Sequence, residues 1–193
     1  MAKKSKINQR QRILEEAAKL FKDRGFAGTS MRDLGGEVGM EAASMYNHIK
    51  SKDEILESIC FHISNTYIAQ LAEVERTEAS YTTKLQTLLR QHIRLMLEDG
   101  AAVSVANNDW KHLTGNKLHE FKEARKAYEH GFASLIERGI AAGELQAVNV
   151  SVALFTLLSA VRWVELWYRP GRDVSAEELE ENILTILLNG LAK

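Results

Sequence analysis

The sequence predicts an all-α protein that has a small N-terminal helix-turn-helix domain and a larger helical C-terminal domain. Apolar residues recur every three or four positions through most of the 193 residues, and no stretch alternates in the way of a half-buried strand. Within residues 29–52 a glycine turn separates two short helical patterns. From Tyr81 onward the chain contains helical patterns only, and the last two are strongly apolar.

The composition is that of a soluble globular protein, with 45% apolar and 26% charged residues. Cys60 is the single cysteine, so no intrachain disulfide can form, which fits a reducing cytosol. The start of the chain, MAKKSKINQRQR, lacks the apolar core of a secretory signal, and no apolar run reaches the roughly 18 residues of a membrane span. We therefore expect a cytoplasmic protein with no membrane partner.

The net charge of −1 conceals an asymmetry along the chain. Residues 1–52 hold eleven Lys and Arg against six Asp and Glu, which gives +5, whereas the rest holds fourteen against twenty, which gives −6. A basic segment on a near-neutral protein indicates a localised surface for a polyanion. Small charge imbalances between segments are frequent. This one is informative because a helix-turn-helix motif lies in the same segment.

The first helix is expected from Gln9 to Arg24. Ile13, Ala17 and Phe21 fall on one stripe of it, and charged residues fill the other face. Gly25 ends the helix, since glycine accepts the left-handed conformation of a sharp exit.

The next two short helices form the helix-turn-helix. Ser30 is a suitable cap for a helix that carries Leu34 and Val38 on one face, and Gly39 ends it. In a helix-turn-helix the second helix lies in the DNA major groove. Helix–glycine–helix corners also occur in many all-α proteins that bind no DNA, so the motif alone leaves both interpretations open.

The surrounding residues are more specific than the corner itself. Ten positions within residues 8–56 carry a family pattern, namely Ile13, Ala17, Phe21, Gly25, Thr29, Leu34, Gly39, Tyr46, Lys52 and Leu56. Through them this segment resembles the N-terminal domain of the TetR family of transcriptional regulators. The resemblance implies a homodimeric repressor with a palindromic double-stranded DNA operator and a small-molecule effector.

Residues that contact DNA are expected on and around the second short helix. Small side chains there let the backbone approach base edges, whereas Tyr46 and the basic side chains suit phosphates. The composition of residues 2–8 is equally consistent with a basic arm that contacts phosphates and with a solvated terminus. The candidate set is Lys3, Lys4, Thr29, Arg32, Glu41, Ala42, Ala43, Ser44, Tyr46, Asn47, His48, Lys50 and Lys52.

Two features depart from the family pattern. Gly35 and Gly36 lie inside the second helix, where each costs about 0.5–1 kcal/mol relative to Ala. Glu41 stands where the family favours Ser or Thr, and a carboxylate there repels phosphate unless it accepts a hydrogen bond from a cytosine. These departures keep an alternative open, namely a helical dimer that binds a small molecule but not DNA.

The remaining helices follow from apolar spacing and caps. A long helix is expected from Lys52 to Glu75, capped by Ser51. We therefore divide the chain into a helix-turn-helix DNA-binding domain, residues 1–52, and a helical ligand-binding and dimerisation domain, residues 53–193. The further helices are expected at 83–97, 116–142, 149–168 and 175–191, with an irregular stretch at 100–113.

Residues 149–168 are apolar almost all round. The apolar centre is too short for a membrane span, and Arg162 and Glu165 interrupt its end, so a buried helix is expected. Together with residues 175–191 it carries more apolar surface than one subunit buries easily. We therefore expect a homodimer packed through these helices, which would space its two recognition helices about 34–36 Å apart.

A cluster of indoles and guanidiniums lies at the end of the same segment. Trp163 and Trp167 are one helical turn apart, and Arg162 and Arg169 flank them, so the cluster suits a planar ring and phosphates. An aromatic packing anchor at a dimer interface is the competing explanation.

A second resemblance bears on this cluster. The runs 167–171 and 139–145 make residues 110–191 similar to TetR-type regulators that respond to coenzyme A thioesters. The similarity implies that an acyl-CoA places its nucleotide end among the indoles and guanidiniums and its acyl part in an apolar pocket. The residues assigned to this effector are Trp110, Phe121, Arg162, Trp163, Trp167 and Arg169.

The sequence offers no motif for catalysis or for a metal. The six histidines lack the spacing of a zinc site, and no nucleophile elbow or phosphate-cradling glycine loop is present. We therefore predict no enzyme activity, no catalytic residue, no cofactor and no metal site.

Overall fold

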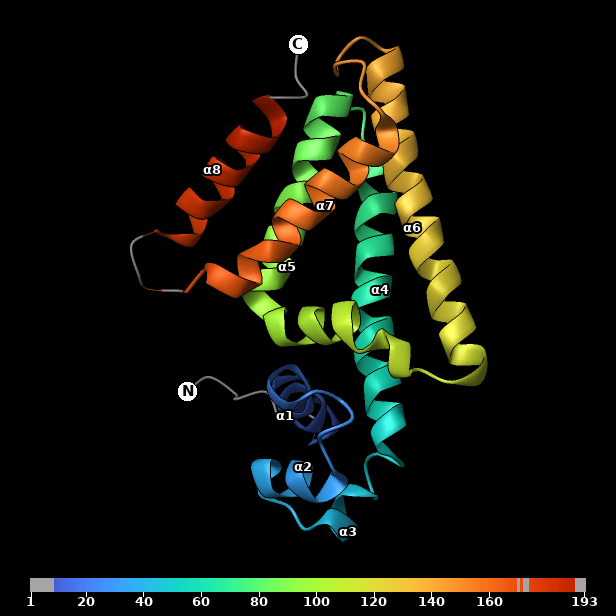
Figure 1. The fold of residues 1–193 in the computed structure, drawn as a ribbon, viewed down its shortest axis with the longest axis vertical. Coiled ribbons are helices and arrows are strands. Elements are labelled where there is room, and N and C mark those ends of the chain that lie inside the picture. The colour runs from blue at the N-terminus through green and yellow to red at the C-terminus, as the bar shows by residue number, and fades with distance from the viewer. Residues whose placement is uncertain (1–8, 170, 172–173, 190–193) are drawn as a thin grey trace, which may run out of the picture. The chain divides into compact units, whose positions relative to one another are not determined.

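The computed structural model describes residues 9–169, 171 and 174–189, and the elements that it describes there are helices (Figure 1). This confirms the predicted all-α fold class. In chain order they are α1 Gln9–Arg24, α2 Met31–Val38, α3 Ala42–Met45, α4 Lys52–Arg76, α5 Tyr81–Asn108, the 3-10 segment η1 Trp110–His112, α6 Gly115–Ala141, α7 Val150–Trp167 and α8 Ala176–Asn189.

The chain divides into two compact units. The first, which we call the head unit, comprises residues 1–64 and 101–122, and the second, the effector unit, comprises residues 65–100 and 123–193. Each of α4, α5 and α6 therefore contributes residues to both units. The functional division at residue 52 stays a prediction.

Apolar spacing builds the core of the head unit. Ile13, Ala17 and Phe21 of α1 are fully buried, as is Leu34 of α2. The start of α2 is fixed by a capping box, in which Asp33 N–H donates to Ser30 Oγ at 3.2 Å and Ser30 N–H donates to Asp33 Oδ2 at 2.8 Å. The Ser30 hydroxyl also donates to Asp33 Oδ2 at 2.5 Å, and this bond, together with the one from Ser30 N–H, lowers the pKa of the Asp33 carboxyl.

The turn between α2 and α3 follows the expected glycine chemistry. Gly39 ends α2 in the left-handed region at φ 71°. Gly39 N–H and Met40 N–H then donate to the carbonyls of Gly36 and Gly35 at 3.3 and 2.8 Å. Helix α2 is thus continuous through its two internal glycines, and those glycines supply the carbonyls that close the turn.

The loop after α1 is held from two sides within the head unit. The Lys52 ammonium donates to the carbonyls of Phe26 at 2.8 Å and Thr29 at 2.7 Å, and it lies 4.3 Å from the centre of the Phe26 ring. On the other side Phe26 N–H donates to Asp109 Oδ1 at 3.2 Å. The His112 ring stacks on the Phe26 ring with their centres 5.4 Å apart. Residues 109–112 are therefore part of the packing of the head.

Helix α5 extends further than the sequence indicates. The stretch 100–113, expected to be irregular, is helical up to Asn108, and the break falls at Asp99, whose φ of −137° and ψ of 45° are not helical. The break coincides with the division between the two compact units at residues 100 and 101. A local kink rather than a loop explains the irregular apolar pattern.

The effector unit has its own apolar core. It is built on the buried face of α5, which packs with α6, α7 and α8. The largest fully buried side chains in it are Leu85, Leu88, Leu89, Ile93 and Phe132. Asn149 begins α7 by accepting a hydrogen bond from Val152 N–H, and Ser175 Oγ accepts from Glu178 N–H at the start of α8.

An aromatic and polar cluster interrupts this core. His92 is 7% exposed, its Nε2 is hydrogen-bonded to the Tyr128 hydroxyl, and its ring stacks on Tyr67 with their centres 4.1 Å apart. Burial lowers the pKa of His92 to about 3, so the ring is neutral in the folded protein. Burial also raises the pKa of both tyrosines.

Helix α8 is tied to α5 by charge. The Glu180 side chain is 6% exposed and pairs with Arg90 and, through Nε at 2.9 Å, with Arg94. Burial opposes ionisation of this carboxyl, but the hydrogen bonds and charges of the two guanidiniums outweigh it and lower its pKa. Glu181 makes one further contact with Arg90 at 2.8 Å.

Helix α7 buries only one face within the single chain, as expected of a helix with more apolar surface than one subunit buries easily. Ala153, Leu157 and Val164 are buried, but Phe155 is 50% and Trp163 is 61% exposed on the opposite face. Helix α7 is also long and apolar enough to meet a length and composition criterion for a membrane span, which core helices of soluble proteins meet too. An apolar face of α7 is therefore exposed in the part of the single chain that the structure describes.

Replacing Glu180 by Gln should lower the free energy of unfolding by about 1–3 kcal/mol, because Arg90 and Arg94 lose their charged partner. Glu181→Gln is the matched control, with an expected change below about 0.5 kcal/mol, since the Glu181 side chain is 59% exposed. Urea unfolding followed by circular dichroism at fixed protein concentration measures both. Equal losses in the two variants would contradict a structural role for the buried carboxylate.

Acid should weaken the fold through His92. In the unfolded chain the His92 ring is protonated near pH 6.5, whereas in the folded chain it is protonated only near pH 3. Stability is therefore present above pH 6.5 and declines as the pH falls below it, by about 1–2 kcal/mol between pH 6.5 and 5.

The test is urea unfolding at several pH values. His92→Gln should flatten the profile between pH 5 and 6.5, whereas His130→Gln, at an exposed position on α6, should keep the wild-type slope. A slope that survives in His92→Gln would assign the acid sensitivity to another group.

Candidate DNA-binding and effector sites

The segment from Glu41 to Lys50 has one buried side and one exposed side. Met45 and Ile49 are four residues apart and are 0% and 1% exposed, so they anchor the segment in the core of the head. Tyr46 is 53% exposed. We call the outward side the recognition surface, and its exposed members are Glu41, Ala43, Ser44, Tyr46, Asn47, His48 and Lys50.

Contacts from α1 and α4 fix the end of this segment. Lys50 N–H donates to Glu54 Oε2 at 2.8 Å, and Arg10 donates to Glu54 Oε1 at 3.2 Å and to Ser58 Oγ at 2.9 Å. The hydrogen bond from Lys50 is the main cause that lowers the pKa of the Glu54 carboxyl. One carboxylate thereby holds the backbone at Lys50 while leaving the Lys50 side chain exposed.

Two residues predicted to contact DNA also make hydrogen bonds within the head unit. Thr29 is 2% exposed, and its hydroxyl donates to the Gly25 carbonyl at 3.0 Å. The Lys52 ammonium donates to the loop carbonyls already described. A contact of either side chain with a phosphate stays a prediction, and both are engaged inside the head unit.

The other predicted DNA contacts divide into two groups. Arg32 is exposed on α2, as a phosphate contact requires. Lys3 and Lys4 lie outside the residues that the structure describes, as does the side chain of Ala42. Their roles stay predictions.

Trp110 and Phe121, the predicted acyl contacts, lie together in the head unit. Their rings stack with centres 6.1 Å apart, and the Phe61 ring meets Phe121 edge-on at 5.8 Å. Two ammonium groups lie over the cluster, Lys122 over Trp110 at 5.9 Å and Lys117 over Phe61 at 5.4 Å. Phe121 is 5% exposed, so a ligand reaches this cluster only where Trp110 and Phe61 are partly open.

The indole and guanidinium cluster lies in the effector unit. Trp163 and Trp167 are exposed on α7 by 61% and 57%, as an aromatic binding surface requires. Arg169 is turned back on the helix end, where Nη1 donates to the Tyr168 carbonyl at 2.8 Å and Nη2 to the Leu166 carbonyl at 3.3 Å. It therefore satisfies the last carbonyls of α7 in this conformation.

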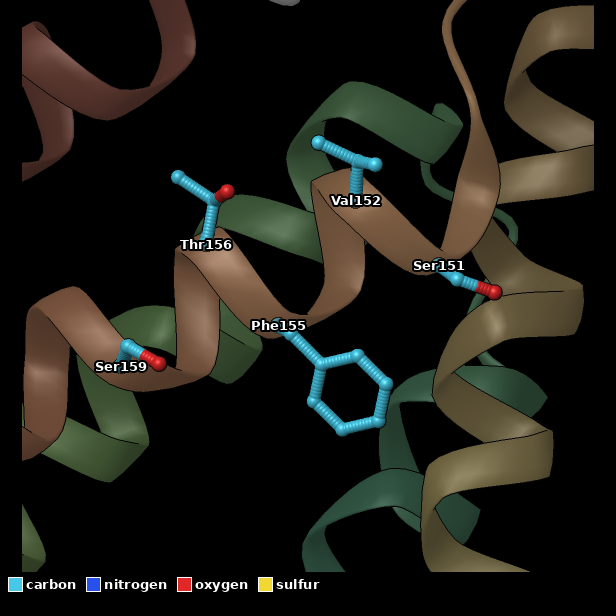
Figure 2. Close-up of a pocket in the computed structure, with 5 residues that line it drawn as sticks. All are labelled: Ser151, Val152, Phe155, Thr156 and Ser159. Carbon is cyan, nitrogen blue, oxygen red and sulfur yellow. The ribbon is translucent and has the colours of Figure 1, made fainter.

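A shallow hollow on α7 was not expected from the sequence. It is lined by Ser151, Val152, Phe155, Thr156 and Ser159, and Figure 2 shows that all five side chains come from this one helix. Residues at this spacing form a continuous stripe that leads to Trp163. The alternation of small polar and apolar side chains along the helix is the feature that could have indicated it.

The described residues offer little reactive chemistry. No group of three His, Cys, Asp or Glu side chains placed to hold a metal ion occurs among them. Cys60 is buried, and burial raises the pKa of its thiol to about 12, so the thiol is protonated at neutral pH.

Two segments of the chain match models of known protein families. Residues 13–59 match the model described as bacterial regulatory proteins of the tetR family, and residues 78–191 match the model of the tetracycline repressor-like C-terminal domain. The chain belongs to the TetR family. Its helix-turn-helix is that of a DNA-binding transcriptional regulator, as the resemblance of residues 8–56 predicted.

The similarity to individual relatives extends over nearly the whole chain. This chain is 26% identical to the HTH-type transcriptional repressor KstR2 of Rhodococcus jostii over 190 residues. The matched region covers 97% of this chain and 93% of the relative. The chain is also 26% identical over 188 residues to the KstR2 repressor of Mycolicibacterium smegmatis, 96% of this chain and 92% of the relative.

Solved structures agree with this. The structure of AibR in complex with isovaleryl coenzyme A and operator DNA is 25% identical, with a TM-score of 0.81 over 93% of this chain and 97% of that one. The ketosteroid regulator KstR2 of Mycobacterium tuberculosis shares the fold with a TM-score of 0.90 at 22% identity, over 97% of this chain and 96% of that one.

Tyr46→Ala should weaken operator binding by about tenfold to a hundredfold, because a phosphate loses a hydrogen-bond donor and a ring. Tyr46→Phe should lose only the part due to the hydroxyl. Mobility-shift titrations measure the affinity, and gel filtration checks that both variants keep the wild-type assembly. Unchanged affinity in Tyr46→Ala would remove this residue from the contact surface.

Proposed function

We propose that this TetR-family regulator is a homodimeric repressor that binds a palindromic operator and is released by an acyl-CoA thioester. The observation that carries the proposal is the pair of exposed indoles, Trp163 and Trp167, near the end of α7. It is supported by the likeness to AibR, whose structure contains both isovaleryl coenzyme A and operator DNA.

The exposed face of α7 supports dimerisation. Val152, Phe155 and Leu166 are at least half exposed there, and Ile186 on α8 is 75% exposed. Apolar side chains this exposed on two neighbouring helices in sequence favour packing against a second copy. A two-fold pair of heads then suits a palindromic operator.

The effector chemistry follows from the two aromatic clusters. Indoles beside guanidiniums suit an adenine ring and phosphates, which an acyl-CoA has at one end. An acyl chain is apolar and suits contact with Trp110 and Phe121. Arg162, half-buried on α7, and Arg169 are the proposed cationic partners.

Release requires that the effector binds two states of the protein unequally. The contact of Asp109 with Phe26 offers a link, because η1 begins one residue after Asp109 and includes both Trp110 and His112. An effector that displaces Trp110 would disturb the residues that hold the loop after α1. The recognition surface follows that loop in the chain.

Two related points belong to the proposal. The protein acts by binding in the cytoplasm rather than by catalysis, consistent with relatives that are transcriptional regulators. The alternative is a small-molecule-binding dimer that has lost DNA binding, which the unusual Glu41 in the recognition surface keeps open.

Thermal shift against coenzyme A thioesters of graded acyl length tests the effector. A thioester at 100 times its dissociation constant stabilises the folded state by about 2.7 kcal/mol, which raises Tm by roughly 5–10 °C. The same thioester should release protein from operator DNA in a mobility-shift assay. Free coenzyme A and the free acid are the controls for the two ends of the molecule.

Trp163→Ala should remove the shift, whereas Trp110→Ala should remove preference among acyl chains and keep the response to the nucleotide end. Val152→Ala controls for loss of the α7 face, because it truncates an exposed apolar side chain on the same helix. A protein that stays indifferent to every thioester, yet binds operator, would assign the indoles to packing between subunits.

A further inference from the structure

The carboxylate of Glu41 makes no side-chain contact with the residues of the head unit that the structure describes. Its backbone is extended, at φ −64° and ψ 140°, and its carbonyl accepts from Ser44 N–H at 2.9 Å and Met45 N–H at 3.2 Å. The side chain makes no capping hydrogen bond. It is exposed and forms no ion pair with any residue that the structure describes.

Two other carboxylates in the head have partners within it. Asp33 closes the capping box with Ser30, and Glu54 holds Lys50 and Arg10. Glu41 is also the single acidic residue in the segment 40–52. Its carboxylate is therefore a lone negative charge on the recognition surface.

A negative charge on the recognition surface weakens DNA binding unless the carboxylate accepts a hydrogen bond from a donor on the DNA. Every phosphate repels a carboxylate, and the net charge of +5 on residues 1–52 serves to attract phosphates. The major groove offers donors only at the amino groups of cytosine and adenine. Adenine presents the N7 acceptor beside its amino group, whereas cytosine presents the N4 amino group without an adjacent acceptor.

We propose that Glu41 selects a cytosine in each operator half-site by accepting a hydrogen bond from its N4 amino group. The first residues of a recognition helix are the ones that contact base edges, and Glu41 stands directly before α3. Neighbouring Ala43 and Ser44 are small, so they leave room for the backbone to approach the groove. This inference rests on the proposed DNA-binding function.

Selection of binding sites from a randomised duplex library tests it. The wild-type protein should enrich a palindrome with an invariant C·G pair at one symmetric position, and changing that pair to T·A should weaken binding about tenfold to a hundredfold. Glu41→Gln should move the preference at that position to A·T, because an amide pairs with adenine N6 and N7. Glu37→Gln, an exposed carboxylate on α2, should leave the selected sequence unchanged.

Two outcomes would overturn the inference while leaving DNA binding intact. One is that Glu41→Gln and Glu41→Ala select the wild-type palindrome. The other is that they bind all sequences more tightly by one common factor, which is the mark of relieved phosphate repulsion. Failure of the wild-type dimer to enrich any sequence is a different result, because it would reject the DNA-binding function itself.

Discussion

One ammonium group, that of Lys52, fixes the geometry on which the head unit depends. It closes the loop between α1 and α2 by donating to the carbonyls of Phe26 and Thr29. Hydrogen bonds from a charged donor contribute about 1.5–3 kcal/mol each, and half-burial of this side chain strengthens them. Because α4 begins at Lys52, the same residue ties the first turn of the long helix to the entrance of the helix-turn-helix.

Local rules were enough to predict most of the fold. Ser30 and Ser51 were expected as caps, and each accepts the expected backbone hydrogen bond. Ser175 does the same at the start of the predicted last helix. The sequence was insufficient where a local pattern has two explanations. An irregular apolar pattern at 100–113 indicates either a loop or a kinked helix, and an apolar α7 indicates either a buried helix or an unpartnered face. Packing decides both, and packing is not local.

The candidate sites, too, could be predicted only where local spacing determines them. Tyr46 and the exposed face of the recognition surface follow from helical spacing around Met45 and Ile49, so sequence reasoning could find them. The engaged states of Thr29 and Lys52 could not be found, since their partners lie elsewhere in the chain. Asp109 and Phe26 are 83 residues apart, and no periodicity connects them. His92 is an intermediate case, because its spacing from Leu85 and Leu88 places it on the buried face of α5, but not against Tyr128.

The contact between Asp109 and Phe26 also bears on how a regulator of this kind could switch. Moving an equilibrium from 1:99 to 99:1 needs about 5.5 kcal/mol of differential binding. One hydrogen bond to a carboxylate and one ring stack together supply roughly 2–4 kcal/mol of that difference. Residues 101–122 fall in the C-terminal family match but pack in the head unit. A ligand that rearranges Trp110 would therefore act on the head directly, so a substantial part of the required coupling can arise within one compact unit.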